Sequence, residues 1–398
     1  MKRVLLLDGE SSFALSVVRA FSQLSDWQIE AISSRNLAPM RFSTNCVRTH
    51  LLSAIDSVDN ATYLERLQCV IRKVKPDVLL PIDINGIHFA SAFREELSEF
   101  CQVTPTPSAD MLAIANDKSS FAEFTNQYEF PHPRTLNFSP RNLASQLVQF
   151  EEFRFPILVK PIRSAYGRGI RRFSRIEILR DYFRNQTASS EALIAQEEIL
   201  GTDIDCSMLC KDGNIIASTV QRPLFENKRE FSSPAAIEMV QDEKVISIAS
   251  KLARSLNWSG VAHIDMRYER ESGKVYLIEM NPRFWGSLAA STRAGVNFPI
   301  LCCQLTLGIP LSSTTQRHIR YASGQTLAKV LSRSRPKGQS PLRFSETVFI
   351  DSVVDPLPAI VEFLNPDWRS VNPKRSLRNA FGLSNLALEF LRGRTDKY

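Results

Sequence analysis

Cysteine motifs are missing from this sequence. Its seven cysteines are scattered, no two of them form a CxxC pair, and none lies at zinc-ligand spacing from histidine. The odd number argues against a complete set of disulfides, which belong to oxidising compartments. We therefore expect buried free thiols in a reducing compartment, the cytoplasm.

Long apolar runs are also missing. None approaches the roughly 20 residues of a membrane-spanning helix, so no transmembrane segment is expected. The chain begins with a basic end and a short apolar run, which Asp8 and Glu10 interrupt at once. We interpret this start as a first β-strand and not as a signal peptide.

An extreme charge is the third missing feature. The net charge is +7, with 23% charged and 43% hydrophobic residues, over 398 residues. These values are ordinary for a soluble globular protein with two or three domains and a sizeable core. No nucleic acid partner is expected, and the mild positive balance fits an anionic ligand such as a nucleotide.

Strand and helix patterns alternate over the first hundred residues. Apolar runs predict strands at 2–8, Trp27–Ile32 and Asp77–Ile82, and helical spacing predicts helices over Phe13–Leu24 and Tyr63–Val74. This alternation predicts a parallel sheet with helices on both sides. No GxGxxG dinucleotide fingerprint accompanies it.

Ligands of such sheets lie beyond the carboxyl ends of the strands. That rule points to Asp8-Gly9-Glu10 and Pro81-Ile82-Asp83, with ordinary loops as the equal alternative. Residues 101–108, which are rich in proline and threonine, mark a domain boundary.

The middle of the chain predicts a helix and two hairpins. Helix Ala109–Tyr128 contains Lys118, and residues 156–174 read as a strand, a loop and a second strand. This loop is not a Walker loop, because no GKS or GKT leads into a helix. Lysine and glycines here suit phosphate contacts, and a solvated hairpin tip is the alternative. A further hairpin joins 203–210 to 215–222 through an Asp-Gly turn.

The strongest chemical signal lies in a later hairpin. After a long amphipathic helix at Glu238–Asn257, strands at 260–268 and 274–280 place Asp265 across from Glu279. Asn281 lies two residues beyond Glu279 and so shares its face. Three oxygen ligands of this kind suit Mg²⁺. The alternative is a buried strand that ends in polar turn residues.

Four elements together resemble the ATP-grasp superfamily. They are Asn-Asp-Lys at 116–118, the lysine strand with its glycine hairpin, a Gln-Glu-Glu-Ile-x-Gly-x-Asp hinge at 196–203, and Asp265 followed by Glu279-x-Asn-Pro-Arg. The run EMNPRFWGSLAASTRAGVNFP resembles ATP-grasp carboligases akin to the carbamoyl-phosphate synthase large subunit. The resemblance implies a Rossmann-like pre-ATP-grasp α/β domain at 1–107 and an ATP-grasp domain at 108–311, whose two α+β lobes clasp ATP, with a lid at about 155–200. Residues 312–398 remain as a C-terminal basic segment or small domain.

The resemblance also implies roles for individual residues. It assigns the ATP phosphates to two lysines and a glycine loop, the adenine and ribose to the hinge, Mg²⁺ to three oxygen ligands, and the acyl-phosphate intermediate to an arginine. The residues are, in that order, Lys118 and Lys160; Arg163, Gly167 and Gly169; Gln196, Glu197, Ile199 and Asp203; Asp265, Glu279 and Asn281; and Arg283, with Arg222 as a less close match near the phosphates.

These residues imply an ATP-dependent ligase with Arg283 and Lys160 as catalytic residues. ATP would turn a carboxylate into an acyl phosphate, an amine would attack it, and ADP and phosphate would leave. The cofactors implied are ATP and two Mg²⁺ ions, with Mn²⁺ as a substitute. A bicarbonate-using enzyme of the carbamoyl-phosphate type and a regulatory nucleotide-binding protein are the rival functions. His263 shares a face with Asp265, although a packed or solvated histidine is the alternative.

The C-terminal segment 312–398 is basic. Strand-like Glu346–Val353 precedes helix-like Leu357–Leu364 and Leu383–Leu391. We expect this segment to complete the substrate site or to form a homodimer contact. Docking on a carrier protein or an anionic membrane and a solvated basic tail are the alternatives.

Overall fold

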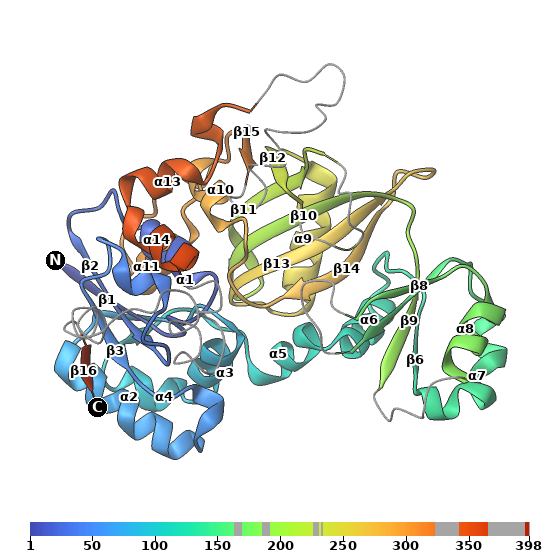
Figure 1. Ribbon diagram of the computed structural model, residues 1–398, viewed down its shortest axis with the longest axis horizontal. Coiled ribbons are helices and arrows are strands. Elements are labelled where there is room, and N and C mark those ends of the chain that lie inside the picture. The colour runs from blue at the N-terminus through green and yellow to red at the C-terminus, as the bar shows by residue number, and fades with distance from the viewer. Residues whose placement is uncertain are drawn as a thin grey trace.

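The computed structural model describes residues 1–162, 169–184, 192–225, 231, 234–322, 342–364 and 395–397. Three β-sheets follow one another along the long axis of the molecule (Figure 1). The first holds the N-terminal strands, the second is the central antiparallel sheet, and the third is a small sheet at the opposite end.

The first sheet is parallel, with strand order β16-β3-β2-β1-β4-β5. Its strands are β1 (Lys2–Leu6), β2 (Trp27–Ser33), β3 (Arg48–Leu51), β4 (Val78–Leu80), β5 (Gln102–Val103) and β16 (Thr395–Lys397). The helical elements of this domain are α1 (Ala14–Arg19), η1 (Pro39–Phe42), η2 (Ile55–Ser57), α2 (Asn60–Val74), α3 (Ile84–Ala92) and α4 (Arg94–Ser98). The predicted parallel sheet is therefore confirmed.

Side chains on β1 alternate between two cores. Val4 and Leu6 belong to one apolar cluster, whereas Leu5 and Leu7 belong to another on the opposite face. Both faces of a parallel sheet are buried beneath helices, so a continuous apolar run is what such a strand requires. The cluster around Val4 also contains Leu209 of the central sheet, so the first two sheets share one core.

The central sheet is antiparallel, with strand order β14-β13-β10-β11-β12-β15. Its strands are β10 (Gly201–Lys211), β11 (Asn214–Pro223), β12 (Ala236–Val240), β13 (Gly260–Glu269), β14 (Val275–Asn281) and β15 (Ile319–Ala322). Helix α9 (Glu243–Ser255) packs on one face, and α10 (Leu288–Arg293) and α11 (Phe298–Leu307) lie toward the first sheet. Strand β15 extends this sheet beyond residue 311.

The predicted helix at Glu238–Asn257 is wrong in its first part. Ala236–Val240 form strand β12, which pairs with β11 and β15, and α9 starts only at Glu243. Asp242 caps that helix by accepting a hydrogen bond from the Val245 amide. This cap marks where the helix begins. The sequence on either side of it is amphipathic both as a strand and as a helix.

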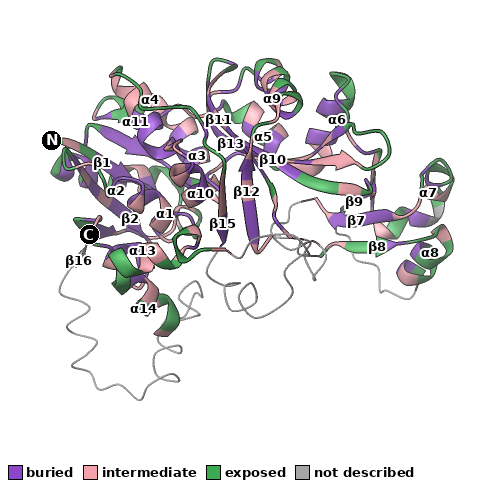
Figure 2. Ribbon diagram, turned by 90° about the horizontal axis from the view of Figure 1, so that it is seen from above, coloured by how far each residue is buried: buried purple, intermediate pink, exposed green. Residues whose placement is uncertain are grey.

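The small sheet has strand order β6-β9-β7-β8. Its elements are β6 (Thr135–Phe138), η3 (Pro140–Asn142), α7 (Leu143–Phe150), β7 (Ile157–Pro161), β8 (Arg171–Phe173), α8 (Ile176–Arg184) and β9 (Leu193–Glu197). Figure 2 shows α7 and α8 beside this sheet, with exposed outer sides. The sheet begins at Thr135, earlier than the expected lid start at about 155, because β6 pairs with β9.

Two helices, and not one, connect the first domain to the small sheet. The predicted helix Ala109–Tyr128 is broken into α5 (Ala109–Asn116) and α6 (Lys118–Gln127). Asp117 adopts an extended conformation between them and accepts hydrogen bonds from the Ser119 and Ser120 amides. Lys118 therefore lies in the first turn of α6. Its side chain points in a different direction from that of a lysine in the middle of one continuous helix.

The C-terminal segment differs from its prediction. Instead of a strand at Glu346–Val353, the structure has η5 (Phe344–Glu346) and helix α13 (Phe349–Val354), followed by α14 (Pro356–Leu364). Successive apolar residues from Thr347 onward fit either period, so the sequence alone did not separate strand from helix. The expected helix at Leu383–Leu391 lies outside the described residues.

Asp355 anchors this segment to the first domain. Its carboxylate is buried and accepts hydrogen bonds from Arg19 Nε at 3.1 Å, Ser43 Oγ at 2.7 Å and the Thr44 amide at 3.0 Å. Replacing Asp355 by alanine is expected to lower the free energy of unfolding by about 3 kcal/mol, because it leaves Arg19 without this buried partner. Urea denaturation measures the loss.

The exposed pair between Lys2 and Asp26 supplies the control for this prediction. Its atoms are closer than those of the Arg19–Asp355 pair, at 2.7 Å against 3.1 Å, but its side chains are 33% and 56% exposed. Asp26→Ala is expected to change stability little. Equal losses for the two variants would contradict the role of Asp355 as an anchor.

In the part of the chain that the structure describes, no helix has the length and apolar character needed to cross a membrane.

Candidate active site

The β13–β14 hairpin brings the three predicted metal ligands together. Asp265 is paired with Glu279 in the register of the two strands, and a bulge follows Asp265. Asn281 Nδ2 donates a hydrogen bond to Asp265 Oδ2 at 3.2 Å. Two carboxylates and one amide oxygen on one face of a strand pair are a donor set that fits Mg²⁺.

Lys118 reaches the hairpin from α6. Its Nζ lies 3.3 Å from Glu279 Oε2, and both side chains are mostly shielded from solvent. Burial raises the pKa of the Glu279 carboxyl, and neighbouring Asp265 raises it further, whereas Lys118 and Lys160 lower it. The cluster thus holds two acids and two lysines in a poorly solvated place.

Lys160 reaches the same place from the small sheet. It is buried on β7, and its Nζ donates a hydrogen bond to Gln196 Oε1 at 2.6 Å. Burial lowers the pKa of Lys160 to about 8, with Glu279 opposing the shift and Lys118 adding to it. A polyanion bound between the two lysines would favour their charged forms.

The hinge strand β9 presents its polar residues in two directions. Gln196 accepts from Lys160 and donates from Nε2 to Thr135 Oγ1 at 3.0 Å, so its amide lies beside the lysine and not at a free hinge edge. Glu197 accepts from the Arg154 amide at 2.9 Å and from Arg154 Nε at 3.3 Å. The Glu197 carboxylate is therefore occupied by hydrogen bonds from within the protein. Ile199, just beyond the strand, is buried.

Asp203 lies at the beginning of β10, and its carboxylate forms an ion pair with Arg267. It shares the sheet face of Asp265, because Asp203 pairs with Arg267 and Asp205 pairs with Asp265 in the register. About half of the Asp203 side chain is exposed, at 53%. That exposure leaves its carboxylate accessible to a hydroxyl-bearing ligand.

Of the predicted glycine loop, only Gly169 lies within the described residues, and Arg163 and Gly167 lie outside them. Gly169 has φ +77°, and a Cβ there would lie 2.8 Å from Pro161 Cγ. Both the positive φ and the close approach require glycine.

Arg222 is not brought to the site. Gln221 faces Asp205 across β10 and β11, so Arg222, the next residue, lies on the opposite face of the sheet. It pairs there with Glu238 of β12, at 2.6 Å between Nε and Oε1, and is half exposed.

Arg283 lies between the predicted metal ligands and the first sheet. Its Nη2 donates to Asn281 Oδ1 at 3.1 Å, its Nη1 donates to the Phe284 carbonyl at 2.9 Å, and its guanidinium lies 4.7 Å from the centre of the Phe13 ring. Its Nε is also 3.9 Å from Asp83 Oδ1, at the end of β4. The arginine is held in place from both domains.

The loops that follow β1 and β4 meet at this point. Asp8 Oδ2 accepts from the amides of Ile82 at 3.2 Å and Asp83 at 2.9 Å, and Ser11 Oγ donates to Asp83 Oδ2 at 2.7 Å. Strand order reverses between β1 and β4. Such a switch point is where open α/β sheets bind ligands, and here it adjoins Arg283.

Comparison with known proteins shows what the chain resembles. A family model described as "ATP-grasp in the biosynthetic pathway with Ter operon" matches residues 189–329. In this stretch the chain is similar to ATP-grasp proteins. D-aspartate ligase of Enterococcus faecium is 23% identical over 314 residues, which cover 73% of this chain and 74% of the relative.

Two further similarities bear on the length and fold of this chain. The carbamoyl phosphate synthase large chain of Campylobacter jejuni is 25% identical over 301 residues, which cover 71% of this chain but 26% of that one. The crystal structure of L-amino acid ligase from Bacillus licheniformis has a TM-score of 0.56 at 16% identity, covering 77% of this chain and 74% of that chain. The predicted ATP-grasp fold is confirmed.

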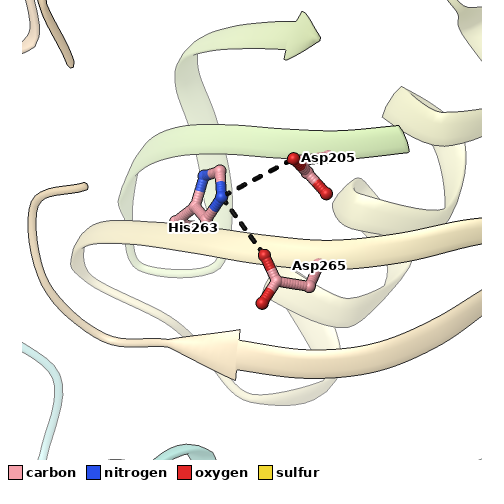
Figure 3. A group of neighbouring side chains, drawn as sticks. All are labelled: Asp205, His263 and Asp265. Atoms are coloured by element: carbon pink, nitrogen blue, oxygen red, sulfur yellow. Dashed lines mark ion pairs between the residues drawn. The ribbon is translucent and has the colours of Figure 1, made fainter. Parts of the chain in front are cut away.

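The sequence-based assignment missed several polar residues of the ATP-grasp sheet. Asp205 and Ser207 on β10 and Gln221 on β11 lie on the same face as His263 and Asp265. Figure 3 shows Asp205 and Asp265 facing the same nitrogen of the His263 ring. The alternation Asp203, Asp205, Ser207 along one strand was the available signal, because every second residue faces the same way.

Asp8 is the most strongly perturbed carboxyl of the switch point. Burial raises its pKa to about 8, and Glu10 and Asp83 add to the shift. Because the folded pKa exceeds the unfolded one, the stability associated with neutral Asp8 is present in acid and is lost as pH rises from about 4 to about 8. Asp8→Asn is therefore expected to gain stability over the wild type across this range, by on the order of a few kcal/mol.

The melting temperatures of wild type and Asp8→Asn at pH 5 and pH 9 measure this gain. Asp56→Asn, at an exposed position of the same domain, is the control and should show a difference that does not change with pH. A melting difference for Asp8→Asn that is the same at both pH values would contradict the buried, uncharged state of Asp8.

Proposed function

We propose that this ATP-grasp protein is an ATP-dependent ligase that joins a carboxylic acid to an amine, with release of ADP and phosphate. The observation that carries the proposal is the meeting of Lys118 and Lys160, from separate elements, at the Glu279 end of the hairpin. Arg283 lies next to Asn281 on the side of the first sheet. This order supports a phosphate site at the two lysines, with a site for the substrate carboxylate next to it at Arg283.

Each group has a chemical task in this reaction. Lys118 and Lys160 neutralise the triphosphate, and Asp265, Glu279 and Asn281 hold two Mg²⁺ ions, for which Mn²⁺ can substitute. The ions supply charge neutralisation and hold the phosphates in line. Arg283 binds the substrate carboxylate, so that one of its oxygens attacks the γ-phosphorus and the bond to ADP breaks.

The second half of the reaction uses the activated acid. The amine attacks the carbonyl carbon of the acyl phosphate, phosphate leaves with the bonding electron pair, and the amine loses a proton. The names of two similar proteins, D-aspartate ligase and L-amino acid ligase, support an amino acid as one of the two substrates. The carboxylate of Asp83 at the switch point favours a substrate that carries an ammonium group.

We assign the rest of the nucleotide to the side of the two lysines that is opposite Arg283. We assign the adenine to the hinge at Glu197 and Ile199, the ribose to Asp203, and the loop of Arg163, Gly167 and Gly169 to the phosphates. The buried position of Ile199 and the half-exposed carboxylate of Asp203 support this assignment.

An ADP-release screen tests the proposed function. Amino acids and other carboxylates, in pairs with amines, are mixed with the protein, ATP and Mg²⁺. We expect ADP formation that requires both an acid and an amine. ADP formation that requires bicarbonate would favour the carboxylase alternative, and nucleotide binding without any stimulated turnover would favour a regulatory protein.

Compartment and assembly are further parts of the proposal. All seven cysteines are free, and all except Cys69 are buried, which supports a reducing compartment such as the cytoplasm. Exposed apolar side chains on α13 and α14, among them Val353, Val354 and Phe363, support a homodimer contact, with a carrier protein as the other candidate partner. Sedimentation velocity on the isolated protein decides, because a monomer at all concentrations would exclude the dimer.

A further inference from the structure

A histidine and two carboxylates lie close together on the face of the central sheet that carries the proposed Mg²⁺ ligands. His263 Nε2 lies 3.2 Å from Asp265 Oδ1 and 4.0 Å from Asp205 Oδ2 (Figure 3). One ligand atom from each residue lies within 4.8 Å of the other two. The three residues come from the central strands β10 and β13, which pair over their whole length and fix these positions.

The imidazole of His263 is oriented from behind. Ser207 Oγ lies 2.8 Å from Nδ1, and Ser207 is buried. The ring also stacks on Trp285, with 5.8 Å between ring centres and 16° between their planes. When Nδ1 is protonated, its N–H donates a hydrogen bond to Ser207 Oγ, and the lone pair of Nε2 points toward the two carboxylates. Metal-binding histidines are commonly oriented by such a second hydrogen bond.

Gln221 places a buried amide side chain against the carboxylate of Asp205. Its side chain is 95% buried, as its exposed fraction is 5%. Its Nε2 donates to Asp205 Oδ2 at 3.0 Å, whereas its Oε1 has no hydrogen-bond partner among the described residues. A buried amide oxygen without a partner is unfavourable. Turning the amide over would point Oε1 at a cation on Asp205 and would move Nε2 into the position that Oε1 leaves.

We propose that Asp205, His263 and Asp265, with Gln221 beside them, bind a divalent cation of the Mn²⁺ or Zn²⁺ class. The imidazole nitrogen decides the class, because Mg²⁺ and Ca²⁺ prefer oxygen ligands whereas imidazole suits transition metals and zinc. This cation is separate from the Mg²⁺ ions assigned to Glu279 and Asn281.

Asp265 links the two sites. Its Oδ2 accepts from Asn281, and its Oδ1 faces His263, so the two oxygens of one carboxylate point to different neighbours. A cation on Oδ1 would hold Asp265 in the position that the nucleotide-side metal needs. The cation binds to residues of the folded chain alone, and this proposal goes beyond the ligase function without depending on it.

Metal retention by the nucleotide-free full-length chain tests the proposal. The protein is stripped with a chelator, incubated with Mn²⁺ in the presence of excess Mg²⁺, and passed through gel filtration before its metal content is measured. We expect one retained Mn²⁺ per chain. The electron spin-echo modulation of the bound Mn²⁺ should show coupling to an imidazole ¹⁴N nucleus.

Three variants separate this site from its neighbour. Asp205→Asn and His263→Gln should each weaken Mn²⁺ binding at least about tenfold, and His263→Gln should remove the ¹⁴N coupling. Glu279→Gln changes the nucleotide side only and should retain the ion. Melting curves of all variants show whether they are folded, and Ser207→Ala provides a milder variant that should weaken binding while keeping the coupling.

The opposite results would overturn the proposal. They are a wild-type chain that retains no Mn²⁺ or Zn²⁺ against Mg²⁺, or a His263→Gln variant that retains as much as the wild type. In either case the cluster is an ion-pair network in which a protonated His263 bridges two carboxylates. Because no substrate is present, this outcome leaves the proposed ligase function untouched, and a failed ADP-release screen leaves the cation site untouched.

Discussion

Replacing Glu279 by glutamine is expected to reduce ADP formation by roughly 10²–10³-fold, the usual cost of removing one electrostatic stabiliser of a transition state. Glu279 is one of the proposed metal ligands, and it forms the ion pair that holds Lys118, at 3.3 Å. Glutamine keeps the shape but loses the charge, so both contacts are weakened at once. Steady-state ADP release with a substrate pair from the screen measures the change.

Glu271→Gln is the matched control for this experiment. Glu271 lies in the turn of the same hairpin, at its exposed end far from the ligands. The same chemical change there should leave ADP formation unaltered. Full activity of Glu279→Gln would show that the metal assignment on β14 is wrong.

Replacing Arg283 by glutamine is expected to separate nucleotide binding from catalysis. Arg283 lies beyond the metal ligands, held by Asn281 and Phe284 and close to Asp83. Its loss should lower ADP formation with the acid by about 100-fold or more, whereas the Kd for ATP should change by only a few fold. Calorimetric titration with a non-hydrolysable ATP analogue and the ADP assay together measure both quantities.

Arg222→Gln is the control for the arginine. Arg222 pairs with Glu238 on the opposite face of the central sheet and is half exposed. The geometry predicts little effect on either ATP binding or turnover. A strong loss of ATP affinity in Arg222→Gln would instead favour the phosphate role that the sequence resemblance implied.

The hairpin of Asp265 and Glu279 was within reach of sequence reasoning. Two-residue periodicity places Glu279 and Asn281 on one face, and the turn between the strands sets the register against Asp265. The first parallel sheet was likewise predicted, since its strands are short apolar runs between helical patterns. Local rules suffice where each strand is recognised by its own pattern and its partner follows closely in the chain.

Strand β12 shows why other parts were not predicted. It precedes α9 directly, and its partners Pro223 and Tyr321 lie far away on either side in the sequence. The local helical pattern therefore predicted a single helix that includes part of this strand. The same holds for Gln196, whose contact with Lys160 depends on the pairing of β7 with β9 across a long insertion.

The cluster of Asp205 and His263 was missed for a related reason. Each residue alone is an ordinary polar position on a strand, and only the register of β10 with β13 brings them together. Arg222 was placed with the phosphates because its strand was known but its face was not. A shift of one residue in the pairing of the strand would move its side chain to the other face of the sheet.

Transfer of an oxygen atom tests the central claim, carboxylate activation as an acyl phosphate, most directly. An acid labelled with ¹⁸O in its carboxylate is turned over with ATP and an amine, and the released phosphate is analysed by mass. The mechanism predicts one ¹⁸O atom per phosphate, because a carboxylate oxygen remains on phosphorus when the amine attacks. Phosphate without ¹⁸O would contradict the account, as would AMP and pyrophosphate as the products.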